Sequence, residues 1–134
     1  MSVGHYAKND ALIAEMLTDG KLLVCAGRVV LMRDDTWGGR GYRPLRCYED
    51  RDGYRRARIW WKGRRPDLSE HRIILVATLG RPAPTLTVDH VNGCRDDNRA
   101  DNLFPCDHAE NVARGLERVY REPDISDAPG EVPF

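Results

Sequence analysis

A carboxylate, an imidazole and an amide occur at three points of one short stretch, residues 88–115, and their types suit a metal-assisted reaction. The stretch begins with an apolar run that ends in Asp89-His90. A loop rich in Asn, Asp, Gly and Arg follows, and the chain then resumes at Asn102-Leu103 and enters a helix-like segment that carries Asn111. Carboxylate and amide oxygens bind hard divalent cations, and a neutral histidine can accept a proton from water. We therefore expect Asp89 and Asn111 to hold a cation beside the general base His90.

The backbone between these residues must bend for the chemistry to work. Consecutive side chains on a flat strand point to opposite faces, so Asp89 and His90 reach one site only if the chain turns. Asn92-Gly93, directly after them, permits such a turn. The structural alternative is an Asn- and Asp-rich hairpin in which Asp89 and His90 only make turn hydrogen bonds. His108 competes with Asn111 as the third candidate ligand.

The spacing of these residues resembles the active-site finger of HNH endonucleases of the phage and homing type. The resemblance covers roughly residues 20–115, and His71-Arg72 ahead of an apolar run fits the helix that precedes the finger. The segments that follow the family pattern are Val88-Asp89-His90-Val91-Asn92-Gly93, Asp97-Asn98-Arg99, Asn102-Leu103 and Asn111.

The resemblance implies a metal-dependent endonuclease that hydrolyses phosphodiester bonds of double-stranded DNA. His90 would be the general base, and Asn102 would belong to the catalytic set mainly by bracing the loop. One divalent cation, Mg²⁺ with Mn²⁺ as a substitute, would be held by Asp89 and Asn111. The family also suggests a phage origin, and a homodimer or a phage packaging or recombination partner. The alternatives are a DNA-binding module with an inactive finger and a small metal-stabilised structural protein.

The formal net charge is zero, but the basic residues are concentrated in the middle of the chain. Residues 21–81 hold 15 Lys and Arg against 7 Asp and Glu, whereas residues 82–134 hold 5 against 11. A basic segment of this kind is typical of a surface that follows phosphates. Its alternative is a solvated face paired with nearby acids. The predicted DNA-binding residues are Arg56, Arg58 and Lys62 on one strand face, Arg99 in the loop, and Arg114 and Arg118 on the last helix.

The fold class expected from these patterns is α+β, with a small antiparallel β-sheet, helices and a ββα-metal finger. One domain, 1–121, would contain a basic β region (21–66), a buried helix (69–80) and the finger (85–120), followed by a disordered acidic tail (122–134). A first helix capped by Asn9 or Asp10 should end near Thr18, and Ala26-Gly27 should interrupt the strand at 22–32.

The two remaining helices have defined signals at their ends. Ser69 precedes a helix from Glu70 to Leu79, and Gly80 ends it. The apolar surface of this helix predicts that it is buried. His71 at its start is interpreted as structural. Asp107 with Glu110 predicts the N-terminus of the last helix. Its expected buried face is Ala109, Val112, Ala113, Leu116 and Val119.

The composition favours a protein of the cytoplasm, which would be the host cytoplasm if the chain is phage-encoded. No apolar run is as long as a membrane span, and the chain does not begin with a signal segment. The four cysteines form no CxxC pair, so reduced thiols are expected in place of a zinc ribbon or a disulfide.

Overall fold

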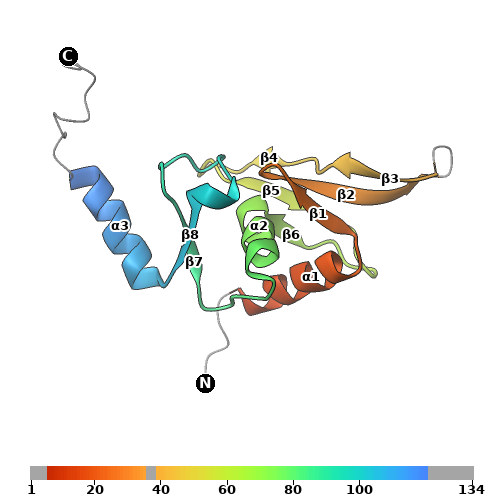
Figure 1. Cartoon of the computed structure of the whole chain (residues 1–134), viewed down its shortest axis with the longest axis horizontal. Helices are drawn as coiled ribbons and strands as arrows, with labels where there is room; N and C mark the ends of the chain where they lie inside the picture. The colour runs from red at the N-terminus through yellow and green to blue at the C-terminus, as the bar shows by residue number, and fades with distance from the viewer. Residues whose placement is uncertain (1–5, 36–38, 121–134) are drawn as a thin grey trace, which may run out of the picture.

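Helix α2 (Glu70–Leu79) lies at the centre of the computed structural model, which describes residues 6–35 and 39–120 (Figure 1). Helix α1 and three small antiparallel sheets, ordered β1-β2-β3, β4-β5-β6 and β7-β8, pack around it, and α3 lies beyond the β7-β8 hairpin. The expected α+β class is confirmed. These other elements are, in chain order, α1 (Ala7–Thr18), β1 (Leu22–Cys25), β2 (Arg28–Asp35), β3 (Gly39–Pro44), β4 (Tyr48–Glu49), β5 (Arg55–Arg58), β6 (Asp67–Ser69), β7 (Thr87–His90), the 3-10 helix η1 (Ala100–Asn102), β8 (Leu103–Cys106) and α3 (His108–Tyr120).

The ends of α2 are those that the sequence predicts. Ser69 is extended, with φ −82° and ψ 133°, and Gly80 adopts the left-handed conformation with φ 71°, which glycine enters without a Cβ clash. The N–H of Gly80 donates to the carbonyl of Val76 and closes the last turn. The Ser69 hydroxyl makes no capping bond and instead accepts from Arg56 at 3.0 Å. Both helix boundaries are therefore confirmed, although Ser69 does not stabilise the helix through its side chain.

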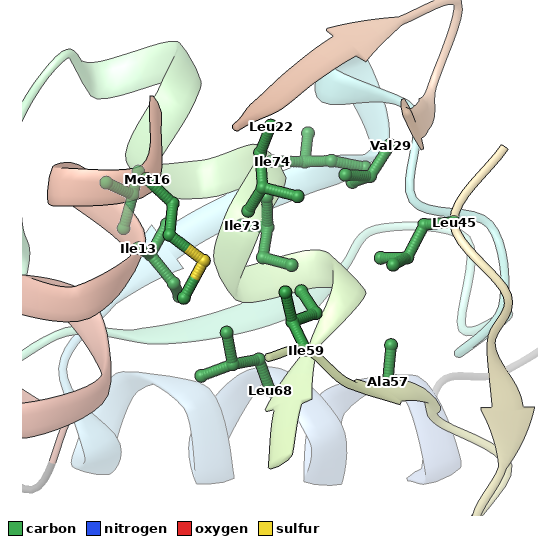
Figure 2. Packing of buried hydrophobic residues seen from close by; sticks show 11 residues of the cluster. Ile13, Met16, Leu22, Val29, Leu45, Ala57, Ile59, Leu68, Ile73 and Ile74 are labelled. Carbon is green, nitrogen blue, oxygen red and sulfur yellow. The ribbon is translucent and has the colours of Figure 1, made fainter. Parts of the chain in front are cut away.

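The hydrophobic core lies where α2 meets α1 and the first two sheets. Figure 2 shows side chains from these elements converging on Ile73 and Ile74. On β5 and its continuation, Ala57 and Ile59 are buried while Arg58 and Trp60 are exposed, as expected of a strand with one buried face. The other buried members of this core are Ile13, Met16, Leu22, Val29, Leu45, Leu68 and Val76.

Helix α1 does not begin with an Asn9 or Asp10 cap, as the sequence predicted. The helix starts at Ala7, and Asp10 lies inside its first turn with no exposed surface. The Asp10 carboxylate forms an ion pair with Arg72 of α2, which is 3% exposed, and accepts from the backbone N–H of Ala83 at 2.9 Å. The acid is therefore used for tertiary contact, because a buried guanidinium needs a buried anion.

Helix α3 exposes the face that the sequence predicted to be buried. Its expected buried face is exposed: Val112, Leu116 and Val119 have 47%, 52% and 73% of their surface accessible. The face that carries Asn111, Arg114 and Arg118 instead turns towards β7. The predicted cap is present, since the N–H of Glu110 donates to the Asp107 carboxylate at 2.7 Å. The predicted tail, 122–134, lies outside the described residues.

No helix among the described residues is both long enough and apolar enough to cross a membrane.

Candidate active site

A cavity of about 180 Å³ opens where strand β7 meets helix α3. The β7-β8 hairpin lies between α2 on one side and α3 on the other, so β7 can present residues to both (Figure 1). The cavity contains the three residues on which the sequence argument rests. Its lining residues are Tyr54, Val88, Asp89, His90, Gly93, Arg95, Asn111, Gly115 and Arg118.

Asp89 faces α3 and is held by two arginines. Arg114 Nε lies 3.0 Å from Asp89 Oδ2, and Arg118 Nη2 lies 3.1 and 3.0 Å from the two carboxylate oxygens. Asp89 is only 5% exposed, so these two guanidinium groups compensate for the water that its carboxylate loses. The hydrogen bond with Asp89 raises the pKa of Arg114 above its usual value.

His90 faces the opposite side of β7, towards α2 and the loop. Its Nε2 atom lies 2.7 Å from Oδ1 of Asn98, whose side chain is completely buried. The rings of Tyr54 and His71 lie 5.9 and 5.3 Å from the His90 ring, measured between centroids. The predicted separation of Asp89 and His90 on opposite faces is thus observed, and both reach the same cavity at the end of the strand.

His71 forms part of the wall behind His90. Its Nδ1 atom is enclosed and has no hydrogen-bond partner among the described residues. Burial, followed by the neighbouring His90, lowers the pKa of His71 to about 3. His71 is therefore neutral at physiological pH, which suits the structural role expected of it.

The loop after β7 is closed by the predicted turn and braced by Asn102. The N–H of Gly93, at φ 78°, donates to the carbonyl of His90 at 2.8 Å. The Asn102 amide donates to Asn92 and to the carbonyl of Asp97 at 2.9 and 2.8 Å, and accepts from the N–H of Asn92 at 3.0 Å. These contacts fit the bracing role expected of Asn102, which does not line the cavity.

The donors around the cavity fit a hard divalent cation. Asp89 offers a carboxylate and Asn111 an amide oxygen, which are oxygen ligands of the kind that Mg²⁺ and Mn²⁺ take. Among residues 6–35 and 39–120, no three His, Cys, Asp or Glu side chains are grouped so that they could hold a metal ion together. Any cation here would therefore depend on waters and a substrate phosphate for the rest of its ligands. The competing candidate, His108, is exposed and lies outside the lining of the cavity.

Most of the predicted DNA-binding residues already have acidic partners. Arg56 lies 3.4 Å from Asp67, Lys62 is paired with Glu15, and Arg99 lies 2.9 Å from Asp97. The hydrogen bonds from Arg99 hold the pKa of Asp97 well below its usual value. Arg114 and Arg118 are paired with Asp89, as described above. Arg58 differs, because it is exposed and its guanidinium lies over the Tyr48 ring, 5.4 Å from the centroid.

Two residues at the site were not singled out from the sequence. Arg95 lies at the cavity with its guanidinium 5.0 Å from the centroid of Tyr54. Glu70, only 1% exposed, accepts from Asn98 Nδ2 at 2.9 Å and so lies directly behind the residue that holds His90. An acidic residue at the start of a helix predicted to be buried was the available signal for Glu70. No local pattern marked Arg95.

Comparisons with known proteins found one family match and one similar structure. Residues 70–113 match the sequence model of a family described as HNH endonuclease. The chain is also similar to a solved structure described as DNA binding and cleavage by the HNH homing endonuclease I-HmuI, with a TM-score of 0.57 and 24% sequence identity. The similar region covers 81% of this chain and 58% of that one, so this chain spans little more than half of its length. No curated protein matches the chain. The structural similarity establishes the fold, and the family match confirms the resemblance found in the finger residues.

Proposed function

We propose that this chain, whose residues 70–113 match the HNH endonuclease family, hydrolyses phosphodiester bonds of DNA at the cavity beside β7. The observation that carries the proposal is the convergence of Asp89, His90 and Asn111 on one cavity of about 180 Å³. A turn-stabilising role for Asp89 and His90 does not require this convergence. The Asp89 carboxylate bonds to α3, whereas His90 bonds to buried Asn98 of the loop that joins β7 to β8.

His90 is the candidate general base. Its Nε2 is engaged by Asn98, which leaves Nδ1 to accept a proton from the attacking water. The water oxygen forms a bond to phosphorus as this proton moves to Nδ1. The bond from phosphorus to the 3′ oxygen then breaks, and the leaving oxygen takes a proton from solvent.

Other residues of the cavity would handle the negative charge of the substrate. A divalent cation bound by Asp89 and Asn111 would neutralise charge on the phosphate and the leaving oxygen. Arg95 and Arg118 line the same cavity and are exposed, so their guanidinium groups can donate to phosphate oxygens. For Arg118 this requires the present bonds to Asp89 to be exchanged for bonds to substrate.

A second surface supports DNA as the substrate. A groove of about 710 Å³ contains Trp60, which is 65% exposed and has the guanidinium of Arg65 5.6 Å from its ring centroid. Trp60 is six residues from Tyr54 of the cavity, a separation of at most about 20 Å, or roughly six base pairs. The distance between the groove and the cavity is therefore within the length of a short duplex. The cationic and aromatic residues of the groove are Lys21, Tyr42, Arg46, Arg58, Trp60 and Arg65.

A plasmid-nicking assay tests the proposal. Wild-type protein with Mg²⁺ or Mn²⁺ should convert supercoiled plasmid to nicked or linear product, and EDTA should abolish the conversion. His90→Ala should bind the same DNA and cut it roughly 10²–10⁴-fold more slowly. His108→Ala is the matched control, since His108 is exposed and lies outside the cavity lining, and it should cut like wild type.

One observation favours a second function, a DNA-binding module with an inactive finger. Two guanidinium groups already neutralise the single carboxylate of the cavity, and they would compete with a cation for it. In that case the wild-type protein would retain DNA in a salt-sensitive manner and would leave the plasmid uncut at every metal concentration.

A further inference from the structure

A chain of buried side chains leads from His90 to the basic strands. His90 Nε2 bonds to Asn98 Oδ1 at 2.7 Å, and Asn98 Nδ2 donates to Glu70 Oε1 at 2.9 Å. Glu70 Oε1 also accepts from Arg55 Nε at 2.9 Å. Asn98 and Glu70 are 0% and 1% exposed, so water cannot replace these bonds. The chain links β7, the finger loop, α2 and β5.

The charge at the far end of this chain fixes every donor and acceptor along it. Glu70 lies beside Arg55 and also has Arg28 at 3.4 Å, and a carboxylate between two guanidinium groups accepts hydrogen bonds but donates none. The Asn98 group facing Glu70 must therefore be its NH₂. Its carbonyl oxygen must then face His90, and an amide oxygen only accepts. Nε2 of neutral His90 must consequently carry the hydrogen.

The second carboxylate oxygen of Glu70 also accepts a hydrogen bond, from a thiol. Cys47 Sγ donates to Glu70 Oε2 at 3.5 Å. Burial, followed by the nearby Glu70 charge, raises the pKa of Cys47 to about 11, so the thiol is neutral and keeps its hydrogen. Both oxygens of Glu70 therefore face donors, and neither is available to rotate towards another partner.

We infer that Glu70, acting through Asn98, is a positioning residue that holds His90 in its Nε2–H tautomer and so presents Nδ1 as the base. The catalytic consequence rests on the proposed function, whereas the tautomer is a property of the protein alone. The device differs from a direct contact between a carboxylate and a histidine. Glu70 orients the Asn98 amide, and the amide orients the His90 ring. The negative charge of Glu70 thereby makes no direct contact with the imidazole.

The tautomer can be measured without DNA or metal. Neutral imidazole in water exchanges between two tautomers, so a single form is the signature of the bond to Asn98. The ¹⁵N shifts of the His90 ring, at about pH 8 where an ordinary histidine is neutral, should show Nε2 protonated and Nδ1 bare. A protonated Nδ1, or a mixture of both forms, overturns the inference. If wild type shows the single tautomer but cuts no DNA, the proposed function fails and the inference stands.

Variants then separate positioning from general stability. Asn98→Leu and Glu70→Ala should each give a mixture of tautomers and slow the single-turnover rate at saturating DNA by about 10- to 100-fold, with DNA affinity unchanged. Glu70→Gln keeps an oxygen that can accept from Asn98 and should recover most of the rate. Ile13→Val removes one buried methyl group of the core far from the chain of bonds, and it should lower stability without altering the tautomer. Unchanged tautomer and rate in folded Asn98→Leu would overturn the positioning role.

Discussion

Replacing His71 with leucine should make the protein more resistant to acid, because wild-type His71 remains neutral in the folded state. Burial lowers its pKa to about 3, whereas an unfolded chain has a histidine pKa of about 6.5. As the pH falls from about 6.5 towards 3, His71 binds a proton in the unfolded state but stays neutral in the native state. The contribution of His71 to stability is therefore fully present above pH 6.5 and is lost progressively towards pH 3.

The magnitude follows from the two pKa values. Between pH 7 and pH 4.5 one such group removes about 2 to 3 kcal/mol from the free energy of unfolding. Over the same pH range, the free energy of unfolding of His71→Leu should fall by about 2 to 3 kcal/mol less than that of wild type. It also removes Nδ1, the enclosed nitrogen that lacks a partner among the described residues.

Urea unfolding of both proteins at several pH values measures the difference. The two proteins share every other ionisable group, so the difference between their pH profiles reports on His71 and its contact with His90. His108→Gln, at an exposed position, controls for the removal of a histidine as such. Parallel pH profiles for wild type and His71→Leu would refute the reasoning.

Three further predictions concern other parts of the molecule. Arg58→Ala should reduce the slope of log K for DNA against log salt by about one, and Arg56→Ala by less, because Arg56 is already paired with Asp67; equal changes would contradict this. Arg118→Ala should strengthen divalent-cation binding, measured by calorimetry, by about two- to fivefold, because the variant lacks one guanidinium group that competes with the cation for Asp89. Weaker binding would show that the arginine supports the site. Gly27→Ala should lower the melting temperature more than Gly63→Ala, because both have positive φ but only the Gly27 Cβ would meet Arg99, at 2.7 Å from Cγ; equal losses would show that Arg99 moves aside freely.

The sequence predicted the elements whose local signals agree. The boundaries of α2 are confirmed because its apolar run is bounded by cap residues. The Ala26-Gly27 turn joins β1 to β2 with both φ angles positive. These signals act over a few residues and do not depend on the rest of the fold.

The errors arose where tertiary contacts decide the outcome. The apolar pattern of α3 correctly indicates which residues share a face, but it cannot show whether another element covers that face. Here the bonds from Arg114 and Arg118 to Asp89 orient the other face towards β7. Asp10 was assigned to a cap for a similar reason, since its partner Arg72 is 62 residues away.

The candidate site shows the same division. Asp89, His90 and Asn111 were identified from residue type and spacing, and the structure brings them to one cavity. Glu70 was missed because its importance depends on Asn98, which is 28 residues further along the chain. Its place at the start of a buried helix is a local signal, but a local pattern does not identify a partner at such a distance.

The most direct test of the central claim is the single-turnover cleavage rate of His90→Ala at saturating DNA and metal. Binding of the divalent cation and of DNA should be retained, because His90 is assigned to proton transfer and Asp89 and Asn111 to the cation. The rate should fall by roughly 10²–10⁴-fold, and added metal should not restore it. Cleavage at the wild-type rate, or full rescue by metal, would contradict the assignment of His90 as the base.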